Sequence, residues 1–183
     1  ETELSVADPV AREHMVADIA QLDAIIDKFL DYARPDHVDL RELALAEVVE
    51  SCVFPFRNLG DIEVRVDVPA NLRVMADEVE LGRVLANLLE NARRYGKSRE
   101  TGKALVHLAA REREHWILIR VRDHGTGVDP ATLANLTRPF FRGDAARTAA
   151  TGTGLGLAVV DRTVRRMSGE FELGNASNGG LAA

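Results

Sequence analysis

The chain has 183 residues, enough for one domain of roughly 100–150 residues and a further segment. Its net charge of −6 argues against a nucleic-acid partner, because binding a phosphate backbone requires a basic surface. The apolar stretches are far shorter than the ~20 residues that span a bilayer. Cys52 is the single cysteine, which excludes an intrachain disulfide, and we expect it to pack in the core.

Residues 10–34 are expected to form one long helix that begins after Asp8-Pro9 and ends at Pro35. Its apolar residues recur at alternating intervals of four and three, as in the seam of a helical bundle: Met15, Ile19, Leu22, Ile26 and Phe29. Such a seam needs a partner helix, which a bundle or a dimer would supply. The alternative is an amphipathic helix packed on the neighbouring domain. Residues 35–38 are expected to form a short linker.

The middle of the chain alternates between helix and strand signals. Asp39 and Asp77 are suitable N-caps, and apolar and charged residues alternate strictly over residues 62–68. The patterns predict, in chain order, a helix, two strands and a second helix: residues 40–54, 62–68, 72–75 and 78–95.

The second half begins with an antiparallel hairpin, expected over residues 103–110 and 115–122. Residues 129–151 carry little pattern, so a loop of this length is either disordered or a functional lid. A helix over 155–167 and a strand over 170–173 are expected to follow. These elements describe an α+β fold with helices on one face of a mostly antiparallel sheet.

Asn87 and Asn91 lie one helical turn apart within the predicted helix. That spacing places both side chains on one face, where amide oxygens can hold a hydrated cation. A capping role or a solvated face is the alternative. Capping is disfavoured because the pair lies in mid-helix beside Leu88 and Leu89.

Asp123 follows a predicted strand and precedes Gly125 and Gly127. A carboxylate in this place can accept an N–H of a base, and the two glycines let the backbone pass close to a ring. The alternative is an ordinary turn aspartate after a strand.

Residues 152–157 read Gly-Thr-Gly-Leu-Gly-Leu and open the last predicted helix. A glycine-rich turn at a helix start offers backbone N–H groups and a positive helix end to phosphates. The stretch matches neither the Walker motif nor the dinucleotide fingerprint. Together with the two asparagines and Asp123, it predicts a pocket for a magnesium–nucleotide complex.

In this order, the motifs resemble the N box, the two glycine boxes and the F box of sensor histidine kinases. The resemblance covers the chain from Val10 onward and is strongest to EnvZ-type osmosensor kinases over residues 87–96, 138–144 and 152–157. It implies the Bergerat (GHKL) fold, a two-layer α/β sandwich shared with gyrase, Hsp90 and MutL-type ATPases, preceded here by a coiled-coil-type helix. It also implies ATP and Mg²⁺ as ligands.

Carried over position by position, the resemblance makes Asn91 the magnesium ligand and Asn87 its neighbour. Asp123 would accept the adenine amine, and Tyr95 would contact the ring, with a core role as its alternative. The other implied ATP-binding residues lie in the glycine and F boxes: Gly125, Gly127, Phe140, Gly143, Gly152, Thr153, Gly154, Leu155, Gly156 and Leu157.

Arg94 and Arg142 are the arginines that the resemblance suggests for neutralising phosphate charge, although exposed arginines are usually only solvated. Phe140 and Phe141 resemble the aromatic residues that anchor the lid on the domain. Plain core aromatics would produce the same pattern.

The family's phosphoacceptor histidine belongs to an H box, and none of the five histidines matches it. The resemblance therefore implies the second helix of the dimerisation hairpin over 1–34, a linker over 35–38 and the ATP-binding domain over 39–183. Such a fragment would bind ATP without phosphorylating itself. Relatives usually continue with a closing strand at Leu181-Ala-Ala183, and the length of that strand stays open here. The implied partners are a response-regulator receiver domain and, through the dimerisation helices, a second copy. The implied location is the cytoplasmic portion of a bacterial inner-membrane protein.

Two other functions are alternatives to the kinase, a hydrolytic ATPase and a scaffold module. A hydrolytic ATPase of the same fold would carry a glutamate base one turn before the metal-binding asparagine, but Asn87 holds that position and Glu90 lies three residues further round the helix. A degenerate pocket on a scaffold module is disfavoured by the intact Asn91, Asp123 and phosphate-loop glycines. The kinase interpretation is preferred.

Overall fold

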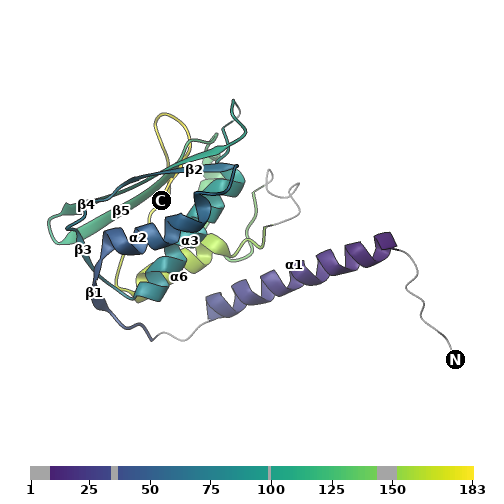
Figure 1. The fold of residues 1–183 in the computed structure, drawn as a ribbon, viewed down its shortest axis with the longest axis horizontal. Helices are drawn as coiled ribbons and strands as arrows, with labels where there is room; N and C mark the ends of the chain where they lie inside the picture. The colour runs from purple at the N-terminus through teal and green to yellow at the C-terminus, as the bar shows by residue number, and fades with distance from the viewer. Residues whose placement is uncertain (1–8, 34–36, 99, 144–151) are drawn as a thin grey trace.

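A five-stranded sheet and three helices form the main body of the computed structural model, which describes residues 9–33, 37–98, 100–143 and 152–183 (Figure 1). The strand order is β2-β4-β5-β7-β6, with β2 parallel to β4 and the other pairs antiparallel. The strands are β2 (Ile62–Asp67), β4 (Ala104–Arg113), β5 (Trp116–Asp123), β6 (Gly174–Asn175) and β7 (Leu181–Ala182).

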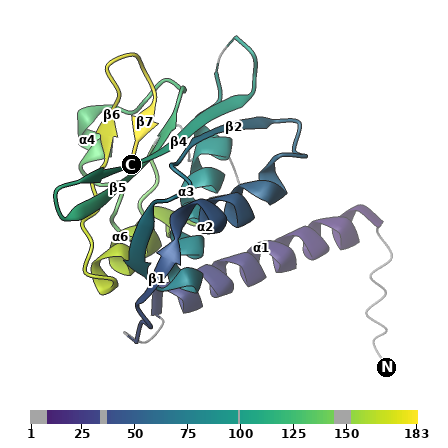
Figure 2. The same ribbon diagram turned by 60° about the vertical axis from the view of Figure 1, so that its left-hand side comes forward.

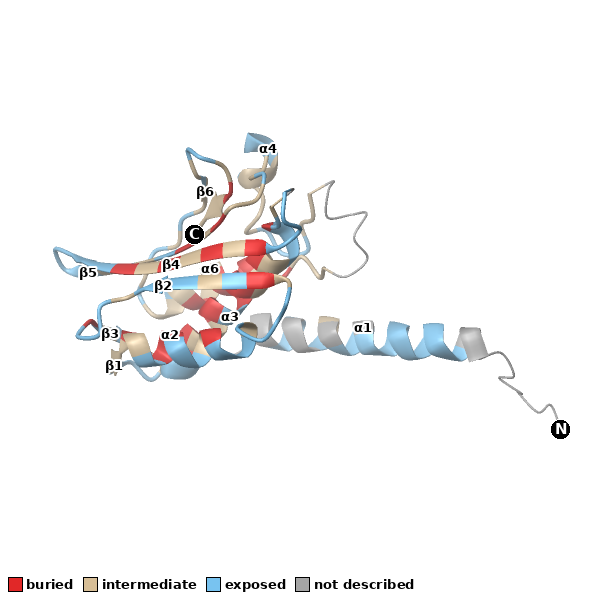
Figure 3. Ribbon diagram, turned by 45° about the horizontal axis from the view of Figure 1, so that its top comes forward, coloured by how far each residue is buried: buried red, intermediate tan, exposed pale blue. Residues whose placement is uncertain are grey.

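Three helices cover one face of this sheet, α2 (Leu45–Val53), α3 (Glu78–Tyr95) and α6 (Gly156–Arg166) (Figures 1 and 3). The core lies between the two layers, as Figure 3 shows by its buried residues. It includes fully buried side chains from both layers: Leu45, Val49, Leu85, Leu89, Val106, Leu108 and Val160. The predicted α+β fold, with helices on one face of a mostly antiparallel sheet, is confirmed. Cys52 is half-buried against the same core.

The N-terminal helix α1 (Pro9–Ala33) confirms the long helix expected there. It contacts α6 and otherwise extends away from the body (Figures 1 and 2). The predicted seam is exposed, since Met15, Ile19, Leu22, Ile26 and Phe29 each keep between 49% and 58% of their surface.

One predicted helix begins later than expected. Residues 41–44 form a strand, β1 (Arg41–Ala44), which pairs antiparallel with β3 (Arg73–Ala76) (Figures 1 and 3). Helix α2 therefore starts at Leu45 and gives way to a 3₁₀ turn, η1 (Phe54–Phe56), around Pro55. Asp39 does not cap α2; its backbone N–H binds Asp77 instead. The pairing partner is about thirty residues away in sequence, so local propensity could not reveal it.

The strand predicted at 170–173 is also wrong in position. The observed strand is β6, at Gly174–Asn175, and its partner β7 reaches only Ala182. Within the lid region, Asp129 accepts the N–H of Thr132 and begins a short helix, α4 (Pro130–Leu133). Residues 144–151 of the predicted lid lie outside the described residues.

Candidate nucleotide-binding site

Helix α3 positions the two asparagines. The helix begins at Asp77, whose Oδ1 accepts the N–H groups of Val79 at 3.0 Å and Glu80 at 3.1 Å. Asn87 is buried, and its Nδ2 donates to the carbonyl of Arg83 at 2.9 Å. Its Oδ1 lies 3.5 Å from the point that a Cβ would occupy at Gly156, so the N box meets the start of α6.

Asp123 ends β5 with only 7% of its surface exposed. Its Oδ1 accepts two backbone N–H groups, from Gly125 at 2.8 Å and from Leu181 at 3.1 Å. Within the described part of the chain, Oδ2 makes no hydrogen bond. Oδ2 is therefore the oxygen that can accept the N–H of a bound base. Gly125 is required here because a Cβ would come 2.9 Å from the Gly96 Cα.

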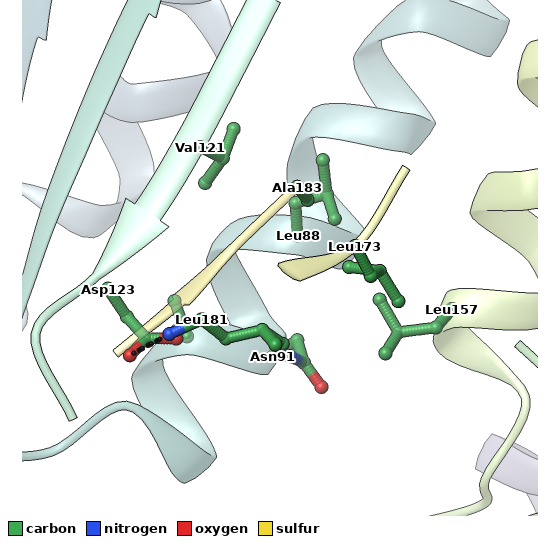
Figure 4. Close-up of a pocket in the computed structure, with 9 residues that line it drawn as sticks. Leu88, Asn91, Val121, Asp123, Leu157, Leu173, Leu181 and Ala183 are labelled. Carbon is green, nitrogen blue, oxygen red and sulfur yellow. Dashed lines mark hydrogen bonds between the residues drawn. The ribbon is translucent and has the colours of Figure 1, made fainter. Parts of the chain in front are cut away.

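A small cavity separates Asp123 from Asn91 (Figure 4). Its volume is about 10 Å³, room for about one water molecule. In Figure 4 the amide oxygen of Asn91 lies on the side away from Asp123. The remaining walls are apolar: Leu88, Ala92, Val121, Leu157, Leu173, Leu181 and Ala183. A purine ring would fit only after these side chains move apart.

The glycine-rich loop leads directly into α6. Leu155 is fully buried and anchors the loop, and the Phe140 N–H donates to the Gly154 carbonyl at 2.9 Å. Gly154 has a φ of +69°, and a Cβ there would come 2.8 Å from the Phe140 carbonyl carbon, so a side chain is excluded. No side chain caps the start of α6 among the described residues. Its first N–H groups can therefore receive an anion.

Other predicted residues lie around this loop at differing distances from the cavity. Tyr95 is 44% exposed, and its hydroxyl group lies against Gly152. Phe140 is 59% exposed, so its backbone rather than its ring fixes the F box to the loop. Arg142 and Gly143 are half-buried. Arg94 is paired with Glu90 at 2.6 Å on the surface of α3.

His124 follows Asp123 in sequence, but its ring packs against a different neighbour. The centres of the His124 and His107 rings lie 4.7 Å apart. Burial lowers the pKa of His124, and the neighbouring Arg122 and His107 lower it further. An uncharged imidazole is therefore favoured beside the carboxylate that would contact the base.

Sequence reasoning missed the contribution of the C-terminal residues. The Leu181 N–H holds the Asp123 carboxylate, and Gly180 packs directly against the Asp123 carbonyl. Asn175 accepts the Val128 N–H at 3.0 Å and donates to the Val128 carbonyl at 2.6 Å, which fixes the second glycine of the Asp123 box. The Gly179-Gly180 pair was the available signal, because adjacent glycines indicate a close backbone approach.

The fold and this arrangement match a known family. The model of the "Histidine kinase-, DNA gyrase B-, and HSP90-like ATPase" family matches residues 76–182, more than half of the chain. The chain belongs to this family. The predicted resemblance to sensor histidine kinases is confirmed as well, because similar proteins include named sensor histidine kinases. The chain is therefore a sensor histidine kinase catalytic domain.

Three similar proteins illustrate the match. The sensor-like histidine kinase SenX3 of Mycobacterium tuberculosis (strain ATCC 25618 / H37Rv) is 42% identical over 115 residues, which cover 62% of this chain and 27% of SenX3. The solved mycobacterial sensor histidine kinase MprB is 25% identical with a TM-score of 0.65, covering 79% of this chain and 93% of that one. Full-length ShkA in complex with AMPPNP has a TM-score of 0.74 at 23% identity, covering 99% of this chain and 38% of ShkA, and shows the shared fold.

The chain spans about a quarter of the length of SenX3. Among the described residues, no helix has the length and apolar character needed to cross a membrane.

Proposed function

We propose that this chain is the nucleotide-binding part of a two-component sensor histidine kinase and that it binds ATP with Mg²⁺. The observation that carries the proposal is the convergence of three sequence-distant groups. The asparagines of α3, the carboxylate at the end of β5 and the glycine loop at the start of α6 surround one site. This site combines an acceptor for a base, uncapped helix N–H groups for phosphates and the side-chain amides of two asparagines.

The residues present fit a magnesium ion. Asn91 lies in the cavity wall, and the Oδ1 of Asn87 faces Gly156 at the start of α6. Amide oxygens are hard ligands, and magnesium completes its coordination with phosphate and water oxygens. Asn91 is the proposed ligand, and Asn87 supports the loop from one helical turn away. The bound ion would neutralise phosphate charge.

For phosphotransfer, the chain's role would be positioning. Asp123 would fix the base, and the N–H groups at the start of α6 would hold the phosphates. The terminal phosphoryl group would then face a histidine on a dimerisation helix. From there it would pass to an aspartate of a response regulator. The dimerisation hairpin of the same protein would include α1 as its second helix, and the phosphoacceptor histidine would lie on the first. The whole would belong to the cytoplasmic portion of a membrane-bound sensor. The resemblance to sensor histidine kinases supports these partners and this location.

Simple ATP hydrolysis is the less favoured function. The position that holds a glutamate base in hydrolytic relatives is Asn87. The nearby Glu90 carboxylate is engaged by Arg93 at 3.0 Å and by Arg94 at 2.6 Å, so it is not free to activate water. Phosphate release at a steady rate, without a histidine partner, would favour hydrolysis instead.

Calorimetric titration with a non-hydrolysable ATP analogue, with and without Mg²⁺, tests the pocket. In Asp123→Asn the two backbone donors would retain the amide oxygen at the Oδ1 position. The amide nitrogen would then face the base and could not accept its N–H. We expect affinity to fall about 10- to 100-fold. Asn91→Ala should remove the dependence on Mg²⁺.

Asp67→Asn is the matched control, because Asp67 is an exposed carboxylate that pairs with Arg111 at 2.6 Å on the edge strand β2. It should bind as the wild type does. Equal affinity of wild type and Asp123→Asn would contradict the assignment of the base-binding carboxylate.

A further inference from the structure

The first observation is a buried ion-pair cluster where the start of α3 meets the end of α6. The Glu80 side chain is 5% exposed and accepts Arg83 Nη1 at 2.9 Å, while Arg166 Nη1 lies 3.6 Å from the same carboxylate. The Arg166 side chain is only 7% exposed. Because the desolvation of buried charges offsets much of their attraction, such a cluster adds little to stability by itself. The nucleotide site does not use it.

Two hydrogen bonds run from this region to the segment that precedes β1. Arg166 Nη2 donates to the His37 carbonyl at 3.2 Å, across 129 positions of sequence. Asp77 Oδ2 accepts the Asp39 N–H at 2.9 Å, while Asp77 Oδ1 serves the α3 N-cap. Each oxygen of Asp77 therefore has a separate task. We call Asp77, Glu80 and Arg166 the linker clamp.

The clamp lies at the far ends of the two helices that carry the nucleotide site. Helix α6 runs from Gly156 in the phosphate loop to Arg166, a length of ~16 Å for its 11 residues. Helix α3 runs from its cap at Asp77 to the asparagines and Tyr95. Helix α1 ends shortly before the clamped segment and contacts α6 (Figure 2). The clamp thus ties the chain that follows α1 to both site helices.

We propose that Asp77 and Arg166 are positioning residues that set the direction in which α1 leaves the ATP-binding domain. This inference rests on the proposed function, in which α1 belongs to the helical bundle that presents the phosphoacceptor. Holding residues 37–39 at two points removes freedom from the connection, so the bundle meets the nucleotide in a restricted set of orientations. Loss of the clamp would leave the nucleotide site intact and free the helix.

Distance measurement by pulsed electron paramagnetic resonance tests the clamp directly. Spin labels would be attached at His14→Cys on α1 and His115→Cys in the β4–β5 turn, both exposed positions, in a Cys52→Ser background. The informative variant is Asp77→Ser, because serine keeps the N-cap of α3 but has no second oxygen for the Asp39 N–H. Asp129→Ser is the matched control, since Asp129 caps α4 and does not touch the linker.

We expect a narrow distance distribution in the wild type and in Asp129→Ser and a broadened one in Asp77→Ser. Nucleotide affinity should stay within about twofold, because the clamp and the site are well separated. Arg166→Lys, which keeps the charge but has one nitrogen in place of the guanidinium fork, should also broaden the distribution and provides the test if Asp77→Ser does not fold.

A distribution that is already broad in the wild type, or one that stays equally narrow in both folded clamp variants, overturns the proposal. The distance measurement needs no nucleotide, whereas the proposed function is judged by the calorimetric titration. The two proposals can therefore fail separately.

Discussion

Helices α1 and α3 both carry large apolar side chains, but those of α1 are mostly exposed and those of α3 are mostly buried. Leu89 on α3 is fully buried, whereas Leu22 on α1 keeps 58% of its surface exposed. Both helices are amphipathic, but only α3 has a sheet to pack against. Among the described residues, the apolar face of α3 is therefore covered within the chain, whereas the seam of α1 stays exposed. An exposed row of large apolar side chains of this kind is typical of interaction sites.

The largest expected effect compares these two leucines directly. Leu89→Ala should lower the free energy of unfolding by about 2–5 kcal/mol, because it leaves a cavity in a closed core. Leu22→Ala should change it by less than about 0.5 kcal/mol, since the side chain is already exposed. Urea denaturation followed by circular dichroism measures both. A similar loss in the two variants would mean that α1 is buried in solution.

The next prediction concerns the partner of α1. If a second copy covers the seam, the chain should associate reversibly, and Ile19→Asp should weaken association by about 30-fold or more. Sedimentation equilibrium measures the dissociation constant. Ala17→Asp adds the same charge on the exposed helix, two positions from the seam residues Met15 and Ile19, and is the control. Association that withstands Ile19→Asp would argue against a dimer through this face.

A smaller effect is expected from pH, and it originates in the sheet rather than in α1. The pKa of His124 is lowered in the folded state by burial and by Arg122 and His107. The unfolded chain therefore binds more protons as pH falls through the ordinary histidine range near 6.5, so stability rises with pH. The contribution of His124 is present above that range and is lost below it.

Thermal unfolding at a series of pH values checks this sign. The wild type should lose stability on acidification through that range, and His124→Asn should lose less. Parallel curves for the two proteins would show that His124 does not contribute to the dependence.

Much of the architecture followed from local sequence. The Asp77 cap placed α3 correctly, and the alternating pattern placed β2. The β4–β5 hairpin was also expected close to its observed range. The glycine and asparagine motifs were recognisable because each demands a particular backbone or ligand chemistry at short spacing. Two local expectations failed at β1 and β6. The partner of β1 lies about thirty residues away, whereas β6 pairs with β7 only six to eight residues further on, and the register of that short hairpin places the strand later than its residue pattern suggests.

The assembly of the site was a different matter. Sequence by itself determined which groups could bind a base, a metal or a phosphate, because these are properties of side chains and of glycine. Only the tertiary structure placed Asn87 against Gly156, gave the Asp123 carboxylate its Leu181 donor and joined Arg166 to the linker. Those contacts span tens of residues and depend on how α3 and α6 pack on the sheet. A local sequence pattern does not specify which distant residues meet, whereas the close packing of the core fixes their positions.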